Sequence, residues 1–382
     1  MMAQPRTEQV SAPATYNPRL DGLRSIAILG VLPVHFLAEP RFLVYVDTGN
    51  LGVKLFFVLS GYLITRILLG YRDRVDNGQA TPGRALFVFY SRRILRLSPL
   101  YYAYLAMAFL LLPGIRDYLG WYLAYLQNFL FAARPDVFAK YLAHLWTLAV
   151  EEQFYLVAPM LLLLAPRRWM KSLMIALVAA GIVFRAAGSA LGFEHFSVAM
   201  MMPAQMDTLG MGALLAVLRW QPGSAARADC LVRWGLVIGL PLTIACHVAQ
   251  ALGEWRMVVF ALDNFALGLL FVFLVGSASS QAPPWGFRIL ELAPLVFLGR
   301  ISYGIYVLHF NVPGLLRDWV FPRLGLLLPG SEALRLLLFT SVSIVLAAAS
   351  FFLYERWFNR LKDLFVLRPA MNGRGLNHRE KR

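Results

Sequence analysis

The sequence predicts an all-α, polytopic integral membrane protein. Of its 382 residues, 59% are hydrophobic and only 15% are charged, and the mean hydropathy is +0.60. This composition excludes an ordinary soluble globular domain. Apolar runs of about 20 residues, the length that crosses a bilayer as a helix, recur along the whole chain.

About ten apolar segments are expected to cross the membrane. They cover residues 20–39, 51–70, 99–114, 142–165, 172–191, 204–218, 232–252, 257–278, 293–316 and 334–357. The third and sixth are short enough to be broken helices or to line a cavity. We expect residues 1–18 to form a disordered cytoplasmic tail and not a cleavable signal, because they are polar and lack an apolar core. Residues 19–358 then form the membrane domain, and residues 359–382 a basic cytoplasmic tail.

The positive charge of the chain predicts its orientation. The net charge is +15, but the basic residues are scattered among the connections and do not gather on one soluble segment, so nucleic-acid binding is not favoured. Of the 36 lysines and arginines, 24 fall in one set of alternate connections and nine in the other. By the positive-inside rule, both termini should be cytoplasmic.

Several catalytic classes lack their motifs. The two cysteines, Cys230 and Cys246, lie in a basic connection and in an apolar segment, which gives neither a disulfide framework nor a thiolate metal site. The sequence has no GxSxG motif, no Walker pattern and no dinucleotide fingerprint. Serine-elbow hydrolysis, ATP hydrolysis and nicotinamide chemistry therefore have no support.

The first apolar segment carries two ionisable residues, Arg24 and His35. They are eleven positions apart, so on a helix they point within about 20° of each other and lie about 16 Å apart along the axis. Ionisable residues inside a span are costly and usually face a polar cavity. Arg24 can also snorkel to the headgroups, and His35 can serve packing alone. In the predicted orientation, Arg24 lies toward the cytoplasm and His35 toward the outer leaflet.

A basic, apolar stretch at residues 84–99 follows the second span. Its pattern, RALFVFYSRRILRLSP, predicts a helix lying at the membrane interface. Arg92, Arg93 and Arg96 would then lie on the same side of the membrane as Arg24. Two interpretations stay open: these arginines hold the topology or bind anionic lipid, or they recognise a phosphorylated cytosolic donor.

Two adjacent carboxylates, Glu151 and Glu152, enter the fourth apolar segment. Adjacent helical residues diverge by about 100°, so only one of them easily faces a given cavity. Glu151, which has Tyr155 four residues later, is a candidate to orient or deprotonate His35, or it bridges helices by hydrogen bonds. Residues 119–132 are aromatic and favour an interfacial or re-entrant piece, either as a headgroup belt or as a carbohydrate platform. Three further polar residues within spans, Lys54, Asp207 and His309, are expected to be network members.

A series of motifs in a fixed order resembles one family. They are Arg24 followed after ten residues by His35, Gly52 with FFVLSGYLI at 56–64, RRILRLSPLYY at 92–102, WTLAVEEQFYL at 146–156, MDTLGMGALLA at 206–216, LGRISYGIYVLHF at 298–310 and YERWF at 354–358. Together they resemble acyltransferase family 3, the polytopic membrane O-acyltransferases. The resemblance implies that Arg24 and His35 are essential and that Glu151 is the recurrent acid of the family.

The resemblance also implies a reaction. Such proteins take an acyl group, often acetyl, from cytosolic acyl-CoA and place it on a hydroxyl of a polysaccharide, a lipid-linked sugar or another acceptor, in a bacterial inner membrane. No metal and no permanently bound cofactor is expected. Two departures stand out: Leu308 replaces the tryptophan often found before the histidine at position 309, and a fused extracytoplasmic hydrolase-like domain is not expected here.

These observations together predict acyl transfer. Histidine titrates near neutrality, so His35 is the expected general base for an alcohol that attacks a thioester. Arg24, Arg92, Arg93 and Arg96 would hold the donor phosphates, and Glu151 would orient the imidazole. A transporter or flippase remains the alternative, although residues 20–165 and 172–357 show no repeat. A membrane glycosyltransferase would be expected to show acidic loop motifs.

Overall fold

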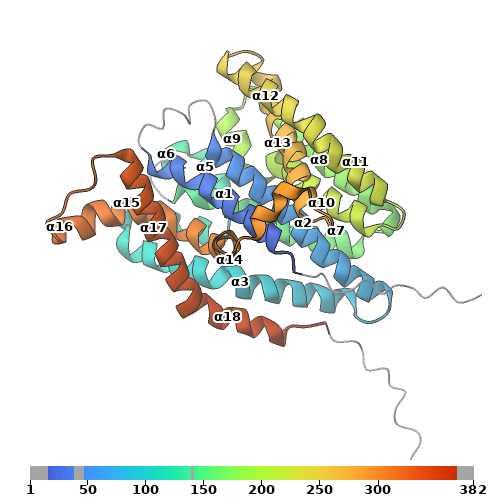
Figure 1. The fold of residues 1–382 in the computed structure, drawn as a ribbon, viewed down its shortest axis with the longest axis horizontal. Helices are drawn as coiled ribbons and strands as arrows, with labels where there is room; N and C mark the ends of the chain where they lie inside the picture. Colours follow the sequence, from blue (N-terminus) through green and yellow to red (C-terminus); the bar gives the residue numbers. More distant parts are fainter. Residues whose placement is uncertain (1–15, 38–46, 139–141, 368–382) are drawn as a thin grey trace, which may run out of the picture.

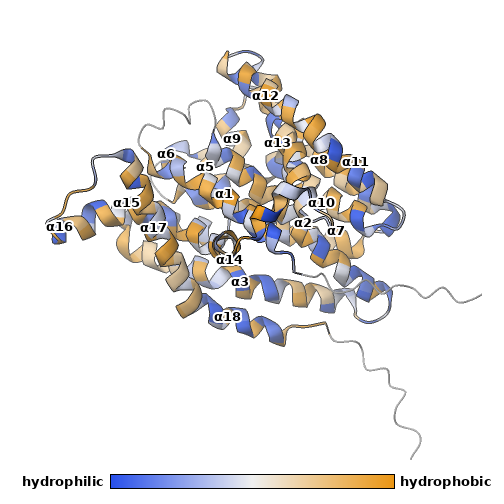
Figure 2. Cartoon of the chain, in the orientation of Figure 1, coloured by the Kyte–Doolittle hydropathy of each residue, from blue (hydrophilic) through white to orange (hydrophobic). Residues whose placement is uncertain are grey.

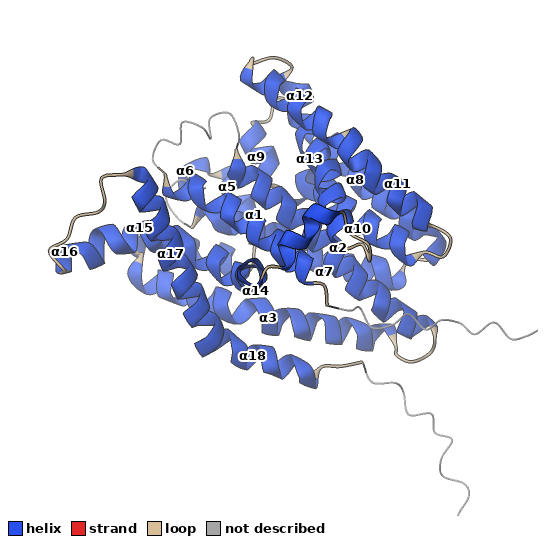
Figure 3. Ribbon diagram, viewed as in Figure 1, coloured by secondary structure: helices blue, strands red, loops and turns tan. Residues whose placement is uncertain are grey.

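The computed structural model describes residues 16–37, 47–138 and 142–367, and these ranges are helical almost throughout, with no strand among them (Figures 1 and 3). The predicted all-α class is therefore confirmed. The parts of the expected tails at residues 1–15 and 368–382 lie outside the described residues.

Eleven long helices build the body of the protein. They are α1 (Pro18–Phe36), α2 (Thr48–Asp76), α3 (Pro82–Leu111), α7 (Trp146–Leu164), α8 (Met170–Ala190), α10 (Met206–Trp220), α11 (Ala225–Val237), α12 (Gly239–Ala251), α13 (Arg256–Ala278), α14 (Ala293–Leu308) and α17 (Glu332–Ser350). Short α-helices connect or extend them: α4 (Leu119–Leu123), α5 (Gln127–Ala133), α6 (Pro135–Phe138), α9 (His195–Met200), α15 (Val312–Gly314), α16 (Phe321–Arg323) and α18 (Arg356–Leu361). Single turns of 3₁₀ or π type fill most remaining connections, and those used below are η4 (Met202–Gln205), η6 (His309–Asn311), η8 (Phe351–Glu355) and η9 (Lys362–Leu364).

Eight helical segments among the described residues are long and apolar enough to cross a membrane. They are Thr48–Asp76, Pro82–Leu111, Ala143–Leu164, Arg167–Ala190, Ala225–Ala251, Arg256–Ala278, Ala293–Arg323 and Glu332–Leu364. Large apolar side chains of these segments are exposed, for example Leu110, Leu337 and Leu353, as a lipid-facing surface requires. Figure 2 shows hydrophobic residues along most of the length of these helices. The chain is therefore an integral, multi-pass membrane protein.

The two remaining expected spans correspond to α1 and α10, which lie among the other helices. α1 carries three charges in its first two turns, Arg19, Asp21 and Arg24, and α10 has only 15 residues. Both pack tightly against α2. A side chain at Gly61 of α2 would collide with the backbone of Leu209 in α10, and one at Gly52 would collide with the backbone of Ala27 in α1. Glycine at these positions lets the helices approach backbone to backbone.

The predicted interfacial helix at residues 84–99 is wrong. The structure has one continuous helix, α3, of 30 residues, with Pro99 inside it. The hydroxyls of Tyr303 and Tyr354 donate to the carbonyls of Leu97 and Pro99, at 2.7 and 3.3 Å. These bonds tie α14 and η8 to α3 around the proline.

The aromatic stretch at residues 119–132 forms α4 and most of α5. Two polar side chains at the start of α5, Gln127 and Asn128, are fully buried. Gln127 donates to the carbonyl of Leu145 at 2.7 Å, and Asn128 donates to that of Met200 at 3.2 Å. These hydrogen bonds tie the stretch to the start of α7 and to the end of α9.

Candidate active site

A cavity lies between five helices that are far apart in the sequence. Its lining comes from α1, α2, α3, α7 and α14: Arg24, Val53, Phe56, Phe57, Ser60, Arg93, Arg96, Leu97, Thr147, Leu148, Glu151, Tyr155, Ser302, Tyr303 and Tyr306. The lining combines apolar and aromatic walls with a few charged groups that converge on one space, as expected for a ligand site.

Three arginines and one carboxylate supply the charge of this cavity. Arg24, Arg93 and Arg96 line it beside Glu151, and none of the ion pairs found in the described ranges involves any of the three arginines. The buried Nε of Arg24 has no hydrogen-bond partner there. The guanidinium of Arg93 lies over the rings of Phe89 and Tyr155, 5.8 and 5.6 Å from their centres. The cavity therefore has an excess of positive charge, which suits an anionic ligand.

Glu151 is held by a short chain of hydroxyl groups. The Tyr155 hydroxyl donates to Oε2 of Glu151 at 3.0 Å and lies 2.5 Å from Oγ of Ser60. Because the tyrosine has a single proton to give, Ser60 is the donor in the second bond. Glu152 is not among the lining residues, which agrees with the divergence of adjacent helical positions.

Arg92 points in another direction from its two neighbours. Its Nη1 donates to the carbonyls of Lys362 and Phe365, at 3.1 and 3.0 Å. These carbonyls belong to the segment at and after η9, which lies beside α3. The structure thus brings Arg24, Arg93, Arg96 and Glu151 together in one cavity and places Arg92 against the end of the described chain.

His35 lies in the last turn of α1, where its ring contacts another histidine. Its Nδ1 is 3.2 Å from the carbonyl of Val31 and 3.3 Å from Nε2 of His309, and the two ring centres are 4.9 Å apart. His309 in turn lies 5.6 Å, centre to centre, from the ring of Tyr306, which lines the cavity. Side chains in contact therefore connect the arginine-lined cavity to His35. Besides the Val31 carbonyl, the hydrogen-bond partner that the described structure gives the His35 ring is the side chain of His309, and not that of Glu151.

A third histidine completes this cluster. The ring of His144 is 5.2 Å from that of His309 and stacks on Phe310 at 4.7 Å. Its Nε2 is 3.2 Å from the carbonyl of Val307, and its buried Nδ1 has no partner in the described structure. Sequence reasoning assigned no site role to His144 and treated His309 as a network member. In the sequence, the histidine cluster was indicated only by the motif SYGIYVLHF, which is rich in aromatic residues and carries both Tyr306 and His309.

Comparison with known proteins identifies the family of the chain. The model of a family described as an acyltransferase domain matches residues 17–355. The chain belongs to this acyltransferase family. It is 28% identical over 330 residues to "Putative O-acetyltransferase SAS0844" of Staphylococcus aureus (strain MSSA476), which covers 78% of this chain and 50% of that protein. It is 27% identical over 339 residues to O-acetyltransferase OatA of Staphylococcus aureus (strain NCTC 8325 / PS 47), over 80% of this chain and 52% of OatA.

The acyltransferase chain thus spans about half the length of the curated relatives it matches. No solved structure matches it. The predicted family membership is confirmed. The match extends from the residue before α1 to the last residue of η8, so it contains all the residues that line the charged cavity and all three clustered histidines.

A separate group of buried polar residues in the acyltransferase holds helices together. Arg185 of α8 pairs with Asp207 of α10 at 2.5 Å, and both side chains are almost fully buried. Lys54 of α2 donates to Gln205 at 2.5 Å, and Asn264 of α13 donates to the same amide oxygen at 3.1 Å. Lys54 and Asp207 are thus members of a hydrogen-bonded network, as predicted, that joins α2, α8, α10 and α13.

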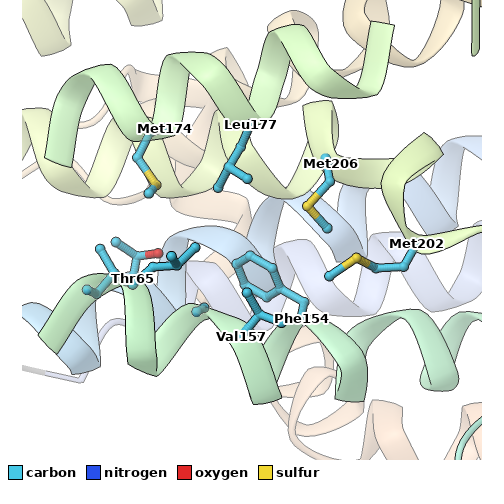
Figure 4. Close-up of a pocket in the computed structure, with 10 residues that line it drawn as sticks. Thr65, Phe154, Val157, Met174, Leu177, Met202 and Met206 are labelled. Atoms are coloured by element: carbon cyan, nitrogen blue, oxygen red, sulfur yellow. The ribbon is translucent and has the colours of Figure 1, made fainter. Parts of the chain in front are cut away.

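A second, smaller cavity lies between α2, α7, α8 and η4 with the start of α10. Figure 4 shows Thr65, Phe154, Val157, Met174, Leu177, Met202 and Met206 around it. Apart from the Thr65 hydroxyl, its lining offers apolar side chains, so it has no charged groups for catalysis. The arginine-lined cavity is therefore the candidate active site of the acyltransferase.

Proposed function

We propose that the protein is a membrane O-acyltransferase that moves an acyl group, expected to be acetyl, from cytosolic acyl-CoA to a hydroxyl of a cell-envelope polysaccharide or lipid-linked sugar. The observation that supports this proposal best is the cavity in which Arg24, Arg93 and Arg96 lie without an ion-pair partner in the described structure. The family match and the names of the relatives support acyl, and specifically acetyl, as the transferred group.

In this proposal the three arginines bind the phosphates of the donor. A guanidinium can give two parallel hydrogen bonds to a phosphate, and these hydrogen bonds are stronger in a cavity that excludes water. Glu151 offsets part of the positive charge while the donor is absent. Arg92, although expected to join them, is engaged with the carbonyls of Lys362 and Phe365 and is left out of the proposed donor site.

The chemical step requires one proton acceptor. The hydroxyl of the sugar substrate attacks the thioester carbonyl while His35 takes the proton of that hydroxyl. The new C–O bond forms and the C–S bond of the thioester breaks. The proton held by His35 then neutralises the leaving thiolate. Purified protein should therefore consume labelled acetyl-CoA and transfer the label to a polysaccharide or lipid-linked sugar fraction. Label that stays on the donor when such acceptors are present would contradict the proposal and favour a transporter.

The first prediction concerns donor binding. Arg24→Ala, Arg93→Ala and Arg96→Ala should each weaken acetyl-CoA binding about 10- to 100-fold, because each removes a charge-assisted hydrogen bond that contributes about 1.5–3 kcal/mol. Calorimetric titration of the detergent-solubilised protein measures this affinity. Arg92→Ala is the matched control: it removes the same charge from the same helix but outside the cavity. Equal loss of affinity in Arg92→Ala and Arg93→Ala would reject the assignment.

The second prediction concerns topology. We propose that α1 and α10 cross the membrane inside the ring of other helices, which makes ten spans, with residues 19–358 as the membrane domain and both termini in the cytoplasm of a bacterial inner membrane. Burial among neighbours permits a short or charged helix at membrane depth. Reporters fused after Arg168 and at the C-terminus should then read cytoplasmic, and a reporter within residues 317–335 should read external. The opposite pattern would place the arginines away from cytosolic acyl-CoA.

A further inference from the structure

We infer that His309 is a positioning residue that fixes the tautomer and the direction of the His35 ring, so that the lone pair that accepts the proton stays on Nε2 of His35. The inference rests on the proposed function, because it assumes that His35 accepts the proton. It is carried by the hydrogen bonds of the two rings, which leave one consistent arrangement of protons.

The tautomer of His309 follows from its backbone contacts. Its Nδ1 lies 2.7 Å from the carbonyl of Tyr306 and 3.2 Å from that of Ile305. Carbonyl oxygens only accept hydrogen bonds, so Nδ1 of His309 must carry a proton. In a neutral imidazole the other nitrogen, Nε2, then has a free lone pair and acts as an acceptor.

The tautomer of His35 follows from two independent contacts. Its Nδ1 lies 3.2 Å from the carbonyl of Val31, which again requires a proton on Nδ1. The same Nδ1 lies 3.3 Å from Nε2 of His309, the lone pair assigned above. Both acceptors thus require the same proton position. The lone pair of His35 is left on Nε2, on the side of the ring away from the His309 contact.

The surroundings make His309 a rigid acceptor. Its side chain has no exposed surface. The neighbouring Tyr306 hydroxyl donates to the carbonyl of His144 at 2.7 Å and lies 2.6 Å from Oγ1 of Thr147. Helices α1 and α14 also pack closely, since a side chain at Gly299 would collide with the backbone of Asp21. The His309 ring therefore keeps its place relative to the last turn of α1.

A neutral acceptor suits this position. A carboxylate that oriented His35 here would be a buried charge in a dry environment and would need its own counter-ion. A neutral histidine whose second nitrogen is bound to two backbone carbonyls needs none. The arrangement performs the orienting role that a carboxylate has in many catalytic triads, without burying a charge.

Two substitutions at His309 separate positioning from packing. In His309→Gln, the amide oxygen can accept the Nδ1 proton of His35, whereas His309→Phe keeps a ring of similar shape and removes the acceptor. If His309 positions His35, His309→Phe should lower kcat about 100-fold, which is at the low end for loss of a general base, and should leave the KM for acetyl-CoA unchanged. His309→Gln should keep kcat within about tenfold of the wild-type value. If His309 serves packing alone, His309→Phe should keep a higher kcat than His309→Gln, and that result would overturn the inference.

A spectroscopic measurement tests the tautomer without turnover. Nitrogen NMR of protein labelled at its six histidines should show His35, identified by the signal lost in His35→Gln, as the Nδ1-protonated form. In His309→Phe the same signal should show a mixture of tautomers. An Nε2-protonated His35 in the wild type, or an unchanged signal in His309→Phe, would overturn the inference. Because no reaction is needed, these results stand even if the protein proves to transfer no acyl group.

Discussion

His35→Gln should lower the kcat of acyl transfer by about 10²- to 10⁴-fold, the usual contribution of a general base. Glutamine can replace a hydrogen bond of the ring, but its amide cannot accept the proton of the acceptor hydroxyl. The folded variant should still bind acetyl-CoA, because the arginines that line the cavity are unchanged. Turnover at saturating donor and acceptor, together with donor affinity by calorimetry, measures both expectations.

His247→Gln is the matched control for this experiment. Nδ1 of His247 bonds to the carbonyl of Thr243 four residues earlier, at 2.9 Å, as Nδ1 of His35 does with Val31, but His247 lies in α12, outside the cluster of His35, His144 and His309. Its replacement should leave kcat nearly unchanged. Near-normal turnover in a well-folded His35→Gln protein would transfer the role of base to Glu151. Glu151→Gln, expected to be milder, would then be the severe variant.

Asp207→Ala should destabilise the protein by about 3–5 kcal/mol, because it leaves the guanidinium of Arg185 buried without its counter-ion. Arg185 is 1% exposed, and its remaining partners are three backbone carbonyls, those of Ala204, Phe260 and Ala261. These dipoles offset only part of the cost of a buried charge. Thermal unfolding in detergent, followed by the loss of helical circular dichroism, should show a clearly lower midpoint.

The exposed pair of Arg317 and Asp318 supplies the control for this stability measurement. Their side chains are 2.7 Å apart, but both are well exposed, so water and salt screen the attraction. Asp318→Ala should therefore leave the unfolding midpoint nearly unchanged. Equal midpoints for Asp207→Ala and Asp318→Ala would mean that the three carbonyls alone satisfy Arg185, and that the buried pair contributes little to stability.

Hydropathy predicted most of the fold, because the length of an apolar run is set by the bilayer. Eight of the ten expected segments correspond to helices that are long and apolar enough to cross it. The expectation of an interfacial helix at residues 84–99, where the structure has the continuous helix α3, failed for a physical reason. Arginine next to an apolar run normally marks the membrane surface, but Arg93 and Arg96 face an internal cavity, and the charged turn therefore continues into the span. A sequence pattern alone does not show which way those side chains point.

The candidate site could be predicted only within local segments. Arg24, Arg93, Arg96 and Glu151 each stood out because a charge in an apolar segment needs a compensating environment, and the structure brings the four together. The contact of His35 with His309 could not be predicted, because 274 positions separate the two residues and their approach depends on the packing of α1 against α14. For the same reason the sequence favoured another partner for His35, Glu151, and treated His309 only as a network member.

In the proposed mechanism, the single helix α1 also sets the size of donor that the protein can use. Arg24 and His35 are fixed on one stiff element, about 16 Å apart along its axis. A donor that contacts both must therefore carry its phosphate and its reactive carbonyl at the two ends of a long, thin arm. Acetyl phosphate, whose carbonyl is bonded directly to the phosphate group, is too short to reach both. In that mechanism, the distance between the two residues on the helix therefore excludes small activated acyl compounds, because they are too short.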